Sequence, residues 1–177
     1  AALTAIITGK YPVDSGIPGD YWYDLDTETV SYFGSDFTTI MREGMETFLN
    51  DFLINLNARY LQADTLFETI EKHDLRAACL NLFVHRGLQD YEISLPGLFN
   101  LFPSPLDGIK VKGPSLLHLG DLHHIDLDGF DASKVGGLSN RFGFKDDTTV
   151  AILKHLVEHG QLPDFTVAYM PDNDWDS

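Results

Sequence analysis

Acidic side chains crowd together near the end of the chain. Asp172, Asn173, Asp174 and Asp176 follow a run of β-branched and aromatic residues at 165–170, a composition that is typical of a strand. Carboxylates held this close repel one another unless a cation binds between them or one of them is protonated. Zinc and hard divalent cations both accept such oxygens. The segment therefore predicts either a metal site at a strand end or a solvated acidic loop.

A second candidate lies at the start of the chain. The first residues have a helical composition and meet Gly9, after which a loop dense in Pro and Gly runs to Asp20. A glycine directly after the last turn favours the end of a helix at that position. The opposite end of such a helix carries free amides and a positive dipole end, which suit anions. The helix and its loop are therefore compatible with supporting a phosphate site.

Histidine and aspartate side chains are also dense in residues 118–131. Both residue types bind metals, yet unpaired His and Asp are equally common in polar surface loops. His155 and His159 lie four residues apart on a predicted helix, a spacing that can bind a metal but that lacks the rest of a metalloprotease motif. The alternatives for 118–131 are a metallophosphoesterase centre and a polar loop. Its candidate ligands are His118, Asp121, His123, His124, Asp126, Asp128 and Asp131.

Two helix-then-strand units are predicted to position these residues. Asp64 is the expected N-cap of a helix that precedes a buried strand at 77–84, and Thr148 is the expected N-cap of a helix that ends at Gly160 before the strand at 165–170. This order predicts an α/β domain with a mainly parallel sheet. In such sheets the chemistry gathers beyond the carboxyl ends of the strands, which is where Asp172 and Asp174 lie.

The remaining segments predict supporting structure. A polar turn between 21–24 and 29–33 predicts a hairpin, whose aromatic residues Tyr21, Trp22 and Tyr23 are expected to pack on the core rather than to line a pocket. Residues 37–60 are mostly helical in pattern, and Cys79 is expected to be a core thiol. Residues 88–145 are irregular, with many Pro and Gly residues. They predict a cap or insertion outside the main sheet.

The bulk composition excludes several classes. With 12 Lys and Arg against 27 Asp and Glu, the formal net charge is -15. A chain this acidic repels a phosphate backbone, so nucleic-acid backbone binding is not expected. No run of residues approaches the ~20 apolar residues that span a bilayer. The composition indicates one domain with a hydrophobic core.

The start and the end of the chain together resemble one family. Thr8-Gly9-Lys10-Tyr11-Pro12 with Ser15-Gly16-Ile17 is similar to the Thr-Gly-x-Tyr-Pro-x-x-His-Gly-Ile motif of type I phosphodiesterases/nucleotide pyrophosphatases, in the alkaline phosphatase superfamily. Tyr23-Asp24 continues the match. Tyr169-Met170-Pro171-Asp172-Asn173-Asp174 resembles the strand-end segment in which the family carries an Asp-x-x-x-His zinc motif. The order of the segments and the long spacer between them also fit.

The resemblance implies a fold and a chemistry. The fold would be part of an alkaline-phosphatase-like layered α/β domain, with a mainly parallel sheet and helices on both faces. The activity would be hydrolysis of a small phosphate ester or nucleotide by two zinc ions and a threonine nucleophile that forms a covalent intermediate. That threonine would fall just before Ala1, so neither Thr4 nor Thr8 replaces it. Asp174 matches a metal ligand, with Asp172 as the fallback in another register.

Further features of the resemblance bear on activity. The other metal ligands of the family also fall outside residues 1–177, so this stretch is expected to be an internal piece that is inactive in isolation. Ser15 stands where the family has histidine, and Asp20 stands where it has a phosphate-binding asparagine. A carboxylate facing a phosphate repels it unless it is protonated or metal-bound. Asp20 is therefore the expected substrate-facing residue, and it motivates an alternative, a non-catalytic relative that binds a ligand without turnover.

Overall fold

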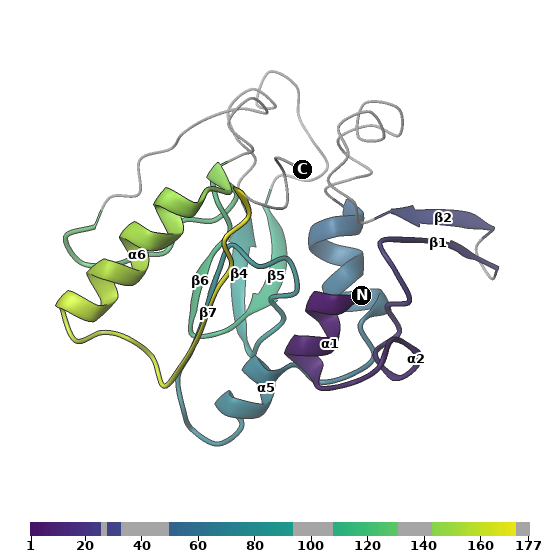
Figure 1. The fold of residues 1–177 in the computed structure, drawn as a ribbon, viewed down its shortest axis with the longest axis horizontal. Helices are drawn as coiled ribbons and strands as arrows, with labels where there is room; N and C mark the ends of the chain where they lie inside the picture. The colour runs from purple at the N-terminus through teal and green to yellow at the C-terminus, as the bar shows by residue number, and fades with distance from the viewer. Residues whose placement is uncertain (26–27, 33–49, 94–107, 131–142, 173–177) are drawn as a thin grey trace.

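A small parallel sheet forms the centre of the molecule (Figure 1). The computed structural model describes residues 1–25, 28–32, 50–93, 108–130 and 143–172. Within them, strand β3 (Ala77–Leu80) lies between β6 (Leu116–His118) and β7 (Phe165–Ala168), and both neighbours run parallel to it. Leu80 is in register with His118 on one side and with Ala168 on the other. All three strands therefore end at the same edge, and the sequence predicts this parallel arrangement for β3 and β7.

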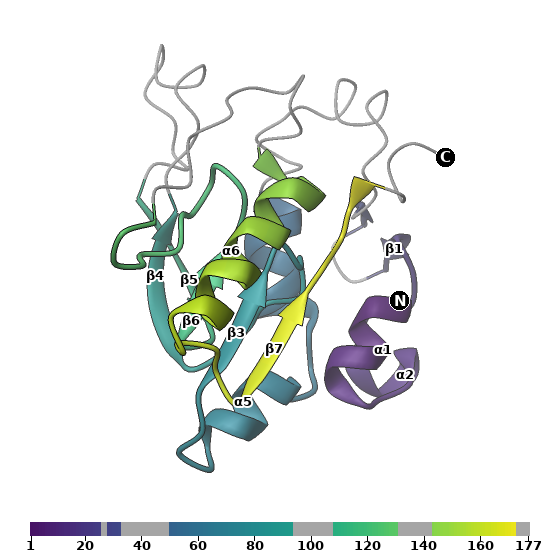
Figure 2. The same cartoon turned by 60° about the vertical axis from the view of Figure 1, so that its left-hand side comes forward.

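Helices cover both faces of this sheet, because alternate side chains of a strand point to opposite faces. On one face, Leu80 packs with Ile152 and Leu156 of α6 (Asp146–Glu158), and Figure 2 shows α6 lying along that face. On the other face, Cys79 belongs to a cluster with Phe67 of α5 (Leu66–Glu71), and this cluster also contains residues of α1 and of the π-helix η1. The predicted α/β arrangement with helices on both faces is confirmed for the described residues.

The first part of the chain forms short helices and a β-hairpin beside the sheet. Helix α1 (Ala2–Thr8) ends at Gly9, whose φ of 63° is left-handed, as predicted. A short helix α2 (Pro12–Ser15) follows within the expected loop, and strands β1 (Tyr21–Asp24) and β2 (Thr29–Tyr32) form the predicted antiparallel hairpin. The π-helix η1 (Asn50–Tyr60) occupies the end of the stretch that was expected to be helical.

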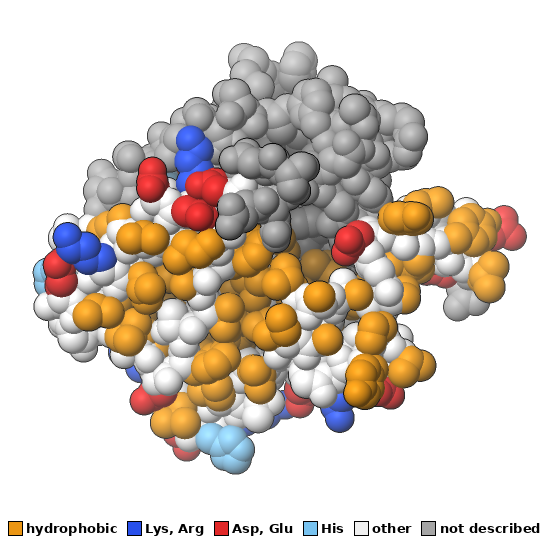
Figure 3. All heavy atoms as spheres, viewed as in Figure 1, with side chains coloured by type: hydrophobic (Ala, Val, Ile, Leu, Met, Phe, Trp, Pro, Cys, Tyr) orange, Lys and Arg blue, Asp and Glu red, His pale blue; other side chains and the backbone are white. Residues whose placement is uncertain are grey.

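The aromatic residues of the hairpin divide into two groups. Trp22 packs on the core, with its ring edge-on to Tyr60 at a centroid distance of 5.2 Å. Tyr21 and Tyr23 are 72% and 55% exposed, so the expectation that they pack on the core is wrong. Figure 3 shows apolar side chains over the hairpin and α2, on the right of that view.

In the described residues no helix is both long enough and apolar enough to span a bilayer.

Both predicted N-caps are misplaced. The N-cap of α5 is Thr65, which forms a capping box: Glu68 N donates to Thr65 Oγ1 at 3.0 Å, and Thr65 N donates to the Glu68 carboxylate at 2.8 Å. Asp64 instead accepts from Lys72 at the surface. Helix α6 begins at Asp146, two residues before Thr148. In the α5 case a capping box satisfies two amides at once, so it prevails over the single bond that Asp64 would offer.

Two strand predictions also need correction. Strand β3 ends at Leu80 rather than at 84, because Asn81 takes a left-handed φ of 60° and turns the chain. Residues 88–145 are not wholly outside the main sheet, since β6 is one of its strands. The same segment contributes β4 (Gln89–Ile93) and β5 (Ile109–Gly113), which form an antiparallel pair. A three-residue strand is too short to show an alternating pattern in the sequence.

Candidate functional site

A buried polar network joins the carboxyl ends of the three parallel strands. Asn81, directly after β3, is fully buried. Its main-chain amide donates to His118 O at 2.8 Å, and its side-chain oxygen accepts from Gly120 N at 2.9 Å. Its side-chain amide donates to Thr149 Oγ1 at 2.8 Å, on helix α6. One asparagine thus fixes the ends of β3 and β6 and the first turns of α6.

The same network reaches the end of β7. Thr149 Oγ1 lies 3.2 Å from the carbonyl oxygens of Lys145 and Tyr169, to either of which it can donate. Tyr169 N in turn donates to Leu80 O at 3.0 Å. The segment that leads to Asp172 is therefore held to the neighbouring strand and to α6 before the acidic loop begins.

Asp172 is held by the first residue of α6. Its main-chain amide donates to Asp146 Oδ1 at 3.0 Å, and its carboxylate accepts from Asp146 N at 3.3 Å. Helix α6 has no side-chain cap from Lys145, so Asp172 supplies an acceptor to one of its free amides. The fallback metal ligand therefore has a structural role. Asp174, Asn173 and Asp176 lie outside the described residues.

Asp20 and the start of α1 line a common hollow of about 70 Å³. Its other walls include Thr4 of α1 and, from the segment that follows β3, Phe83 and Val84. The Asp20 side chain is 78% exposed, so it stands at the rim. Thr4 is only 2% exposed, although it lines the hollow.

Phe83 joins this hollow to the end of β7. Its ring stacks on Phe144 with centroids 5.0 Å apart and contacts Tyr169 edge-on at 6.3 Å. The two segments of the predicted motifs, far apart in the sequence, are thereby brought to the same end of the sheet. The Asp172 segment follows β7 at the carboxyl end of the sheet, as the sequence predicts, and Phe83 links it to the hollow beside Asp20.

The loop between α1 and the hairpin is built around Ser15 and Gly16. Ser15 is buried, and its carbonyl accepts from Gln62 N at 3.0 Å just after η1. Gly16 has a φ of 79°, and a Cβ there would collide with Tyr60 O. Ser15 therefore serves loop packing in this chain. Ser15 and Gly16 thus hold the motif segment in contact with the end of η1.

Residues 118–131 do not assemble a metal site within the part of the chain that the structure describes. His118 is buried, its Nδ1 accepts from Ile125 N at 3.4 Å, and its Nε2 has no partner among the described residues. Burial, with a smaller effect of the nearby His124 and His123 rings, lowers the pKa of His118 to about 3. Residues 118–122 are buried, which a polar surface loop does not predict, whereas Asp126 and Asp128 are exposed and Asp131 lies outside the described residues.

The remaining predicted pair is also not part of a metal cluster. The rings of His155 and His159 stack at 4.0 Å, and His159 Nδ1 lies 2.9 Å from His155 O. Among the described residues, no three His, Cys, Asp or Glu side chains are arranged to hold a metal ion. These two histidines therefore form a local contact along the helix.

The model of the type I phosphodiesterase / nucleotide pyrophosphatase family matches residues 1–177 of the chain. The chain belongs to this family. Curated proteins and solved structures gave no match. Family membership confirms the resemblance of the two motif segments, and it supports a phosphodiesterase- or pyrophosphatase-like function with small phosphate esters or nucleotides as substrates.

Sequence reasoning missed the residues that support these family motifs. Asn81, Phe83 and Thr149 belong to neither motif, and their partners lie far away in sequence: Asn81 and Thr149 are 68 residues apart, and Phe83 contacts the still more distant Tyr169. The only available signal was the polar Asn81 within an otherwise apolar run from Ala77 to Val84. A buried asparagine at the end of a parallel strand is expected to serve a hydrogen-bond network.

Proposed function

We propose that this chain is part of a zinc-dependent phosphoric ester hydrolase whose reaction takes place at the carboxyl end of the β6-β3-β7 sheet. The observation that carries the proposal is that Phe83 lines the hollow beside Asp20 and also contacts Tyr169. Phe83 thus links the two motif segments of one hydrolase family, and the second of them follows a strand at the edge of the sheet where α/β enzymes place their chemistry.

The proposed nucleophile is a threonine just before Ala1 in the parent protein. Ala1 lines the hollow, so a hydroxyl group placed ahead of it would face the same space as Asp20. Attack by that hydroxyl on phosphorus would displace the alcohol or nucleotide leaving group and leave a phosphorylated enzyme, which water then hydrolyses. Thr8 is not a candidate, because its Oγ1 donates to Thr4 O at 2.8 Å inside the helix, and Thr4 is only 2% exposed.

The proposed metal ligand within this chain is Asp174, with Asp172 beside it. Carboxylates after a strand are of the type that zinc binds. The described residues do not by themselves complete a zinc site, and the carboxylate of Asp172 already accepts from Asp146 N. When bound, zinc would supply stabilisation of charge on the attacking and leaving oxygens. The isolated 177-residue piece is proposed to be inactive because it lacks the rest of that site.

Asp20 is the proposed discriminator between substrates. A phosphodiester carries one negative charge near neutral pH, whereas a phosphomonoester carries close to two. An exposed carboxylate at the rim of the hollow repels the second more strongly. We therefore propose that the parent enzyme prefers diesters or pyrophosphate-linked nucleotides to monoesters.

The alternative is a relative that binds a phosphate ester without hydrolysing it. Two observations favour it: Asp20 replaces a phosphate-binding amide, and Ser15 is used for packing. The alternative predicts ligand binding with no turnover.

The experiment is hydrolysis of bis(4-nitrophenyl) phosphate and 4-nitrophenyl phosphate by the full-length parent, with added zinc and with a chelator. Chelator-sensitive hydrolysis that favours the diester supports the proposal. If the parent is folded and zinc-loaded but hydrolyses neither compound, the non-catalytic alternative replaces it. Turnover that is unaffected by the chelator would contradict the metal dependence.

A further inference from the structure

A second pocket lies at the opposite edge of the central sheet. Its lining residues are Arg76, Leu116, Asp126, Leu127, Asp128 and Gln161, and its volume is about 300 Å³. Arg76 directly precedes β3, Leu116 begins β6, and Gln161 precedes β7. The pocket is therefore at the amino ends of the strands, away from the candidate site described above. Its volume is at the lower end of the range for small-molecule sites.

The polar side chains of this pocket have few partners of their own. Within the described part of the chain, the Arg76 guanidinium and the carboxylates of Asp126 and Asp128 take part in no hydrogen bond or ion pair. The side-chain oxygen of Gln161 is buried and likewise has no partner among the described residues. A buried amide oxygen without a partner costs free energy unless a ligand or water supplies a donor.

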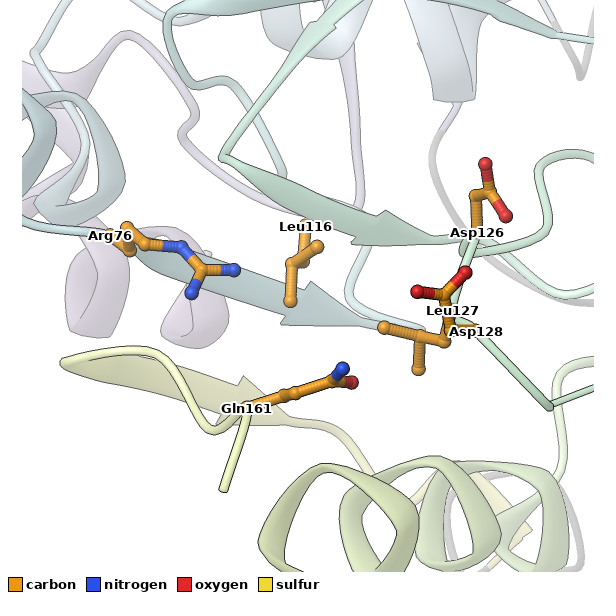
Figure 4. A pocket seen from close by; sticks show the side chains of 6 residues that line it. All are labelled: Arg76, Leu116, Asp126, Leu127, Asp128 and Gln161. Atoms are coloured by element: carbon orange, nitrogen blue, oxygen red, sulfur yellow. The ribbon is translucent and has the colours of Figure 1, made fainter. Parts of the chain in front are cut away.

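The charges face each other across the pocket. Figure 4 shows the guanidinium of Arg76 and the amide of Gln161 reaching in from one side, and the carboxylate of Asp128 from the other. The side chain of Leu116 points into the space between them, and Leu127 provides a second apolar wall. The oppositely charged side chains are too far apart to form an ion pair, since none is found between them within 4.0 Å.

This arrangement selects for a ligand with both charges. A simple anion at Arg76 would be repelled by Asp126, Asp128 and the net charge of -15. A simple cation at Asp128 would leave the Arg76 guanidinium unpaired and would be repelled by it. A molecule with a cation at one end and an anion at the other complements both sides and adds no net charge.

We propose that this pocket binds a small zwitterion with an ammonium group at one end, an anionic group at the other and a short apolar linker between them. The anionic group pairs with Arg76, the ammonium group donates to Asp128, and the linker lies on Leu116 and Leu127. Arg76 offers a planar set of donors that suits a carboxylate or a phosphate equally.

The test is ligand binding to the full-length protein, measured by calorimetry and by ligand-observed NMR. The probes are β-alanine, 4-aminobutyrate and 6-aminohexanoate, which differ in linker length, and phosphoethanolamine, which replaces the carboxylate by a phosphate. Butylammonium and butyrate each carry one of the two charges. We expect at least one zwitterion to bind, with each single-charge analogue weaker by roughly fivefold or more, because both exposed ion contacts contribute.

Variants identify the pocket. Arg76→Gln and Asp128→Asn should each weaken binding of the best probe to the level of the matching single-charge analogue. Lys154→Gln, on the exposed side of α6, should leave the affinity for this probe unchanged.

Three results would overturn the proposal. None of the zwitterions binds, or butylammonium or butyrate binds as tightly as the zwitterions. Alternatively, the Arg76 and Asp128 variants bind the best probe as tightly as the Lys154 control. Preference for phosphoethanolamine over the amino acids that is lost in Arg76→Gln would assign the anion in this pocket as a phosphate. The readout is independent of hydrolysis, so its failure leaves the proposed function untouched.

Discussion

Asp146 and Asp172 cap each other across 26 residues of sequence: the amide of Asp172 donates to the carboxylate of Asp146 at 3.0 Å, and the amide of Asp146 donates to the carboxylate of Asp172 at 3.3 Å. This pair joins the strand-end segment that leads to the acidic loop to the start of α6. The geometry makes Asp172 a structural residue first, whatever it contributes to a metal.

Replacing Asp172 should therefore affect stability. Asp172→Ala removes the acceptor of one helix amide and a negative charge at the start of the helix, and we expect a loss of about 1 kcal/mol in the free energy of unfolding. Asp172→Asn keeps an oxygen acceptor, so its free energy of unfolding should fall by only a few tenths of the loss expected for the alanine variant. Urea unfolding measures both, with Asp147→Ala in the same turn as the control.

The Asp172 variants also distinguish a structural role of this residue from a metal-binding role. If Asp172→Asn keeps its stability and the parent keeps its activity, the metal-binding role is left to Asp174. If activity is lost while stability is kept, Asp172 is a ligand as well. A loss of stability by Asp172→Asn as large as that of the alanine variant would contradict the capping role.

The buried network at Asn81 gives a second prediction. Thr149→Val removes the hydroxyl that accepts from the Asn81 amide at 2.8 Å and leaves that amide buried without an acceptor. We expect a loss of about 1 to 3 kcal/mol. Thr149→Ser keeps the hydroxyl and should retain most of the stability. Thermal or urea unfolding that gave equal losses for both variants would indicate that the methyl group, rather than the hydrogen bond, matters.

Arg86 is predicted to be the most sensitive cation of the described residues. It pairs with Glu68 at 3.0 Å, with the two side chains only 16% and 12% exposed, and it donates to the carbonyls of Asn57, Leu61 and Ala63. Arg86→Met would leave Glu68 half-buried and unpaired, with an expected loss of about 3 kcal/mol.

The matched control for Arg86 is Lys112. Its ion pair with Asp90 is 2.9 Å long, but both side chains are more than half exposed, so Lys112→Met should change stability by less than about 0.5 kcal/mol. Urea unfolding of both variants at one pH measures the difference. Equal effects of the two substitutions would show that the Arg86 network is dispensable.

Stability should fall below neutral pH because of two buried histidines. Burial lowers the pKa of His85 to about 4 and that of His118 to about 3, whereas both titrate near 6.5 when unfolded. The unfolded state therefore takes up protons first as the pH falls. The contribution is complete above pH ~6.5 and is lost progressively toward the folded pKa values, at up to about 1.4 kcal/mol per pH unit for each histidine.

Unfolding experiments between neutral and mildly acidic pH measure this slope before most carboxylates titrate. His118→Leu should make the slope shallower, even if it changes the stability at neutral pH. His73→Leu replaces an exposed side chain and should leave the slope unchanged. A slope unaffected by His118→Leu would mean that His118 takes up its proton over the same pH range in the folded and unfolded protein.

The final prediction concerns Asp20. Asp20→Asn removes the negative charge at the rim of the hollow and restores the residue type of the family motif. In the full-length parent we expect it to raise kcat/KM for 4-nitrophenyl phosphate more than for the diester, by roughly fivefold in the ratio, as for removal of one exposed charge contact. The control is Asp14→Asn in the same loop. If the ratio of the two kcat/KM values did not change, the charge of Asp20 would not act on the bound substrate.

The sequence predicted those helix ends and strands that depend on residues close to one another in the chain. Gly9 ends α1 because a left-handed residue is needed there, and the hairpin at Tyr21–Asp24 follows from β-forming residues on both sides of a turn. The Thr65 cap was also readable, since Glu68 follows at the capping-box distance. The choice of Asp64 missed it by one residue.

Features that depend on distant partners were not predictable. Strand β6 is three residues long and is defined by its pairing with β3, and the left-handed turn at Asn81 is stabilised by contacts with Gly120 and Thr149. For the candidate site, the strand-then-acidic-loop pattern placed Asp172 beyond the carboxyl end of a parallel strand. It could not reveal that Asp172 caps α6, because Asp146 is not adjacent in sequence.

Cys79 gives the molecule a built-in reporter. It is the only cysteine of the chain and lies in the middle strand, fully buried, where loss of solvation raises the pKa of its thiol to about 12. A thiol reagent in solution needs an exposed thiolate, so labelling of the native protein proceeds only through openings that expose the centre of the sheet. The rate of labelling thus reports on those openings in the protein without any engineered residue.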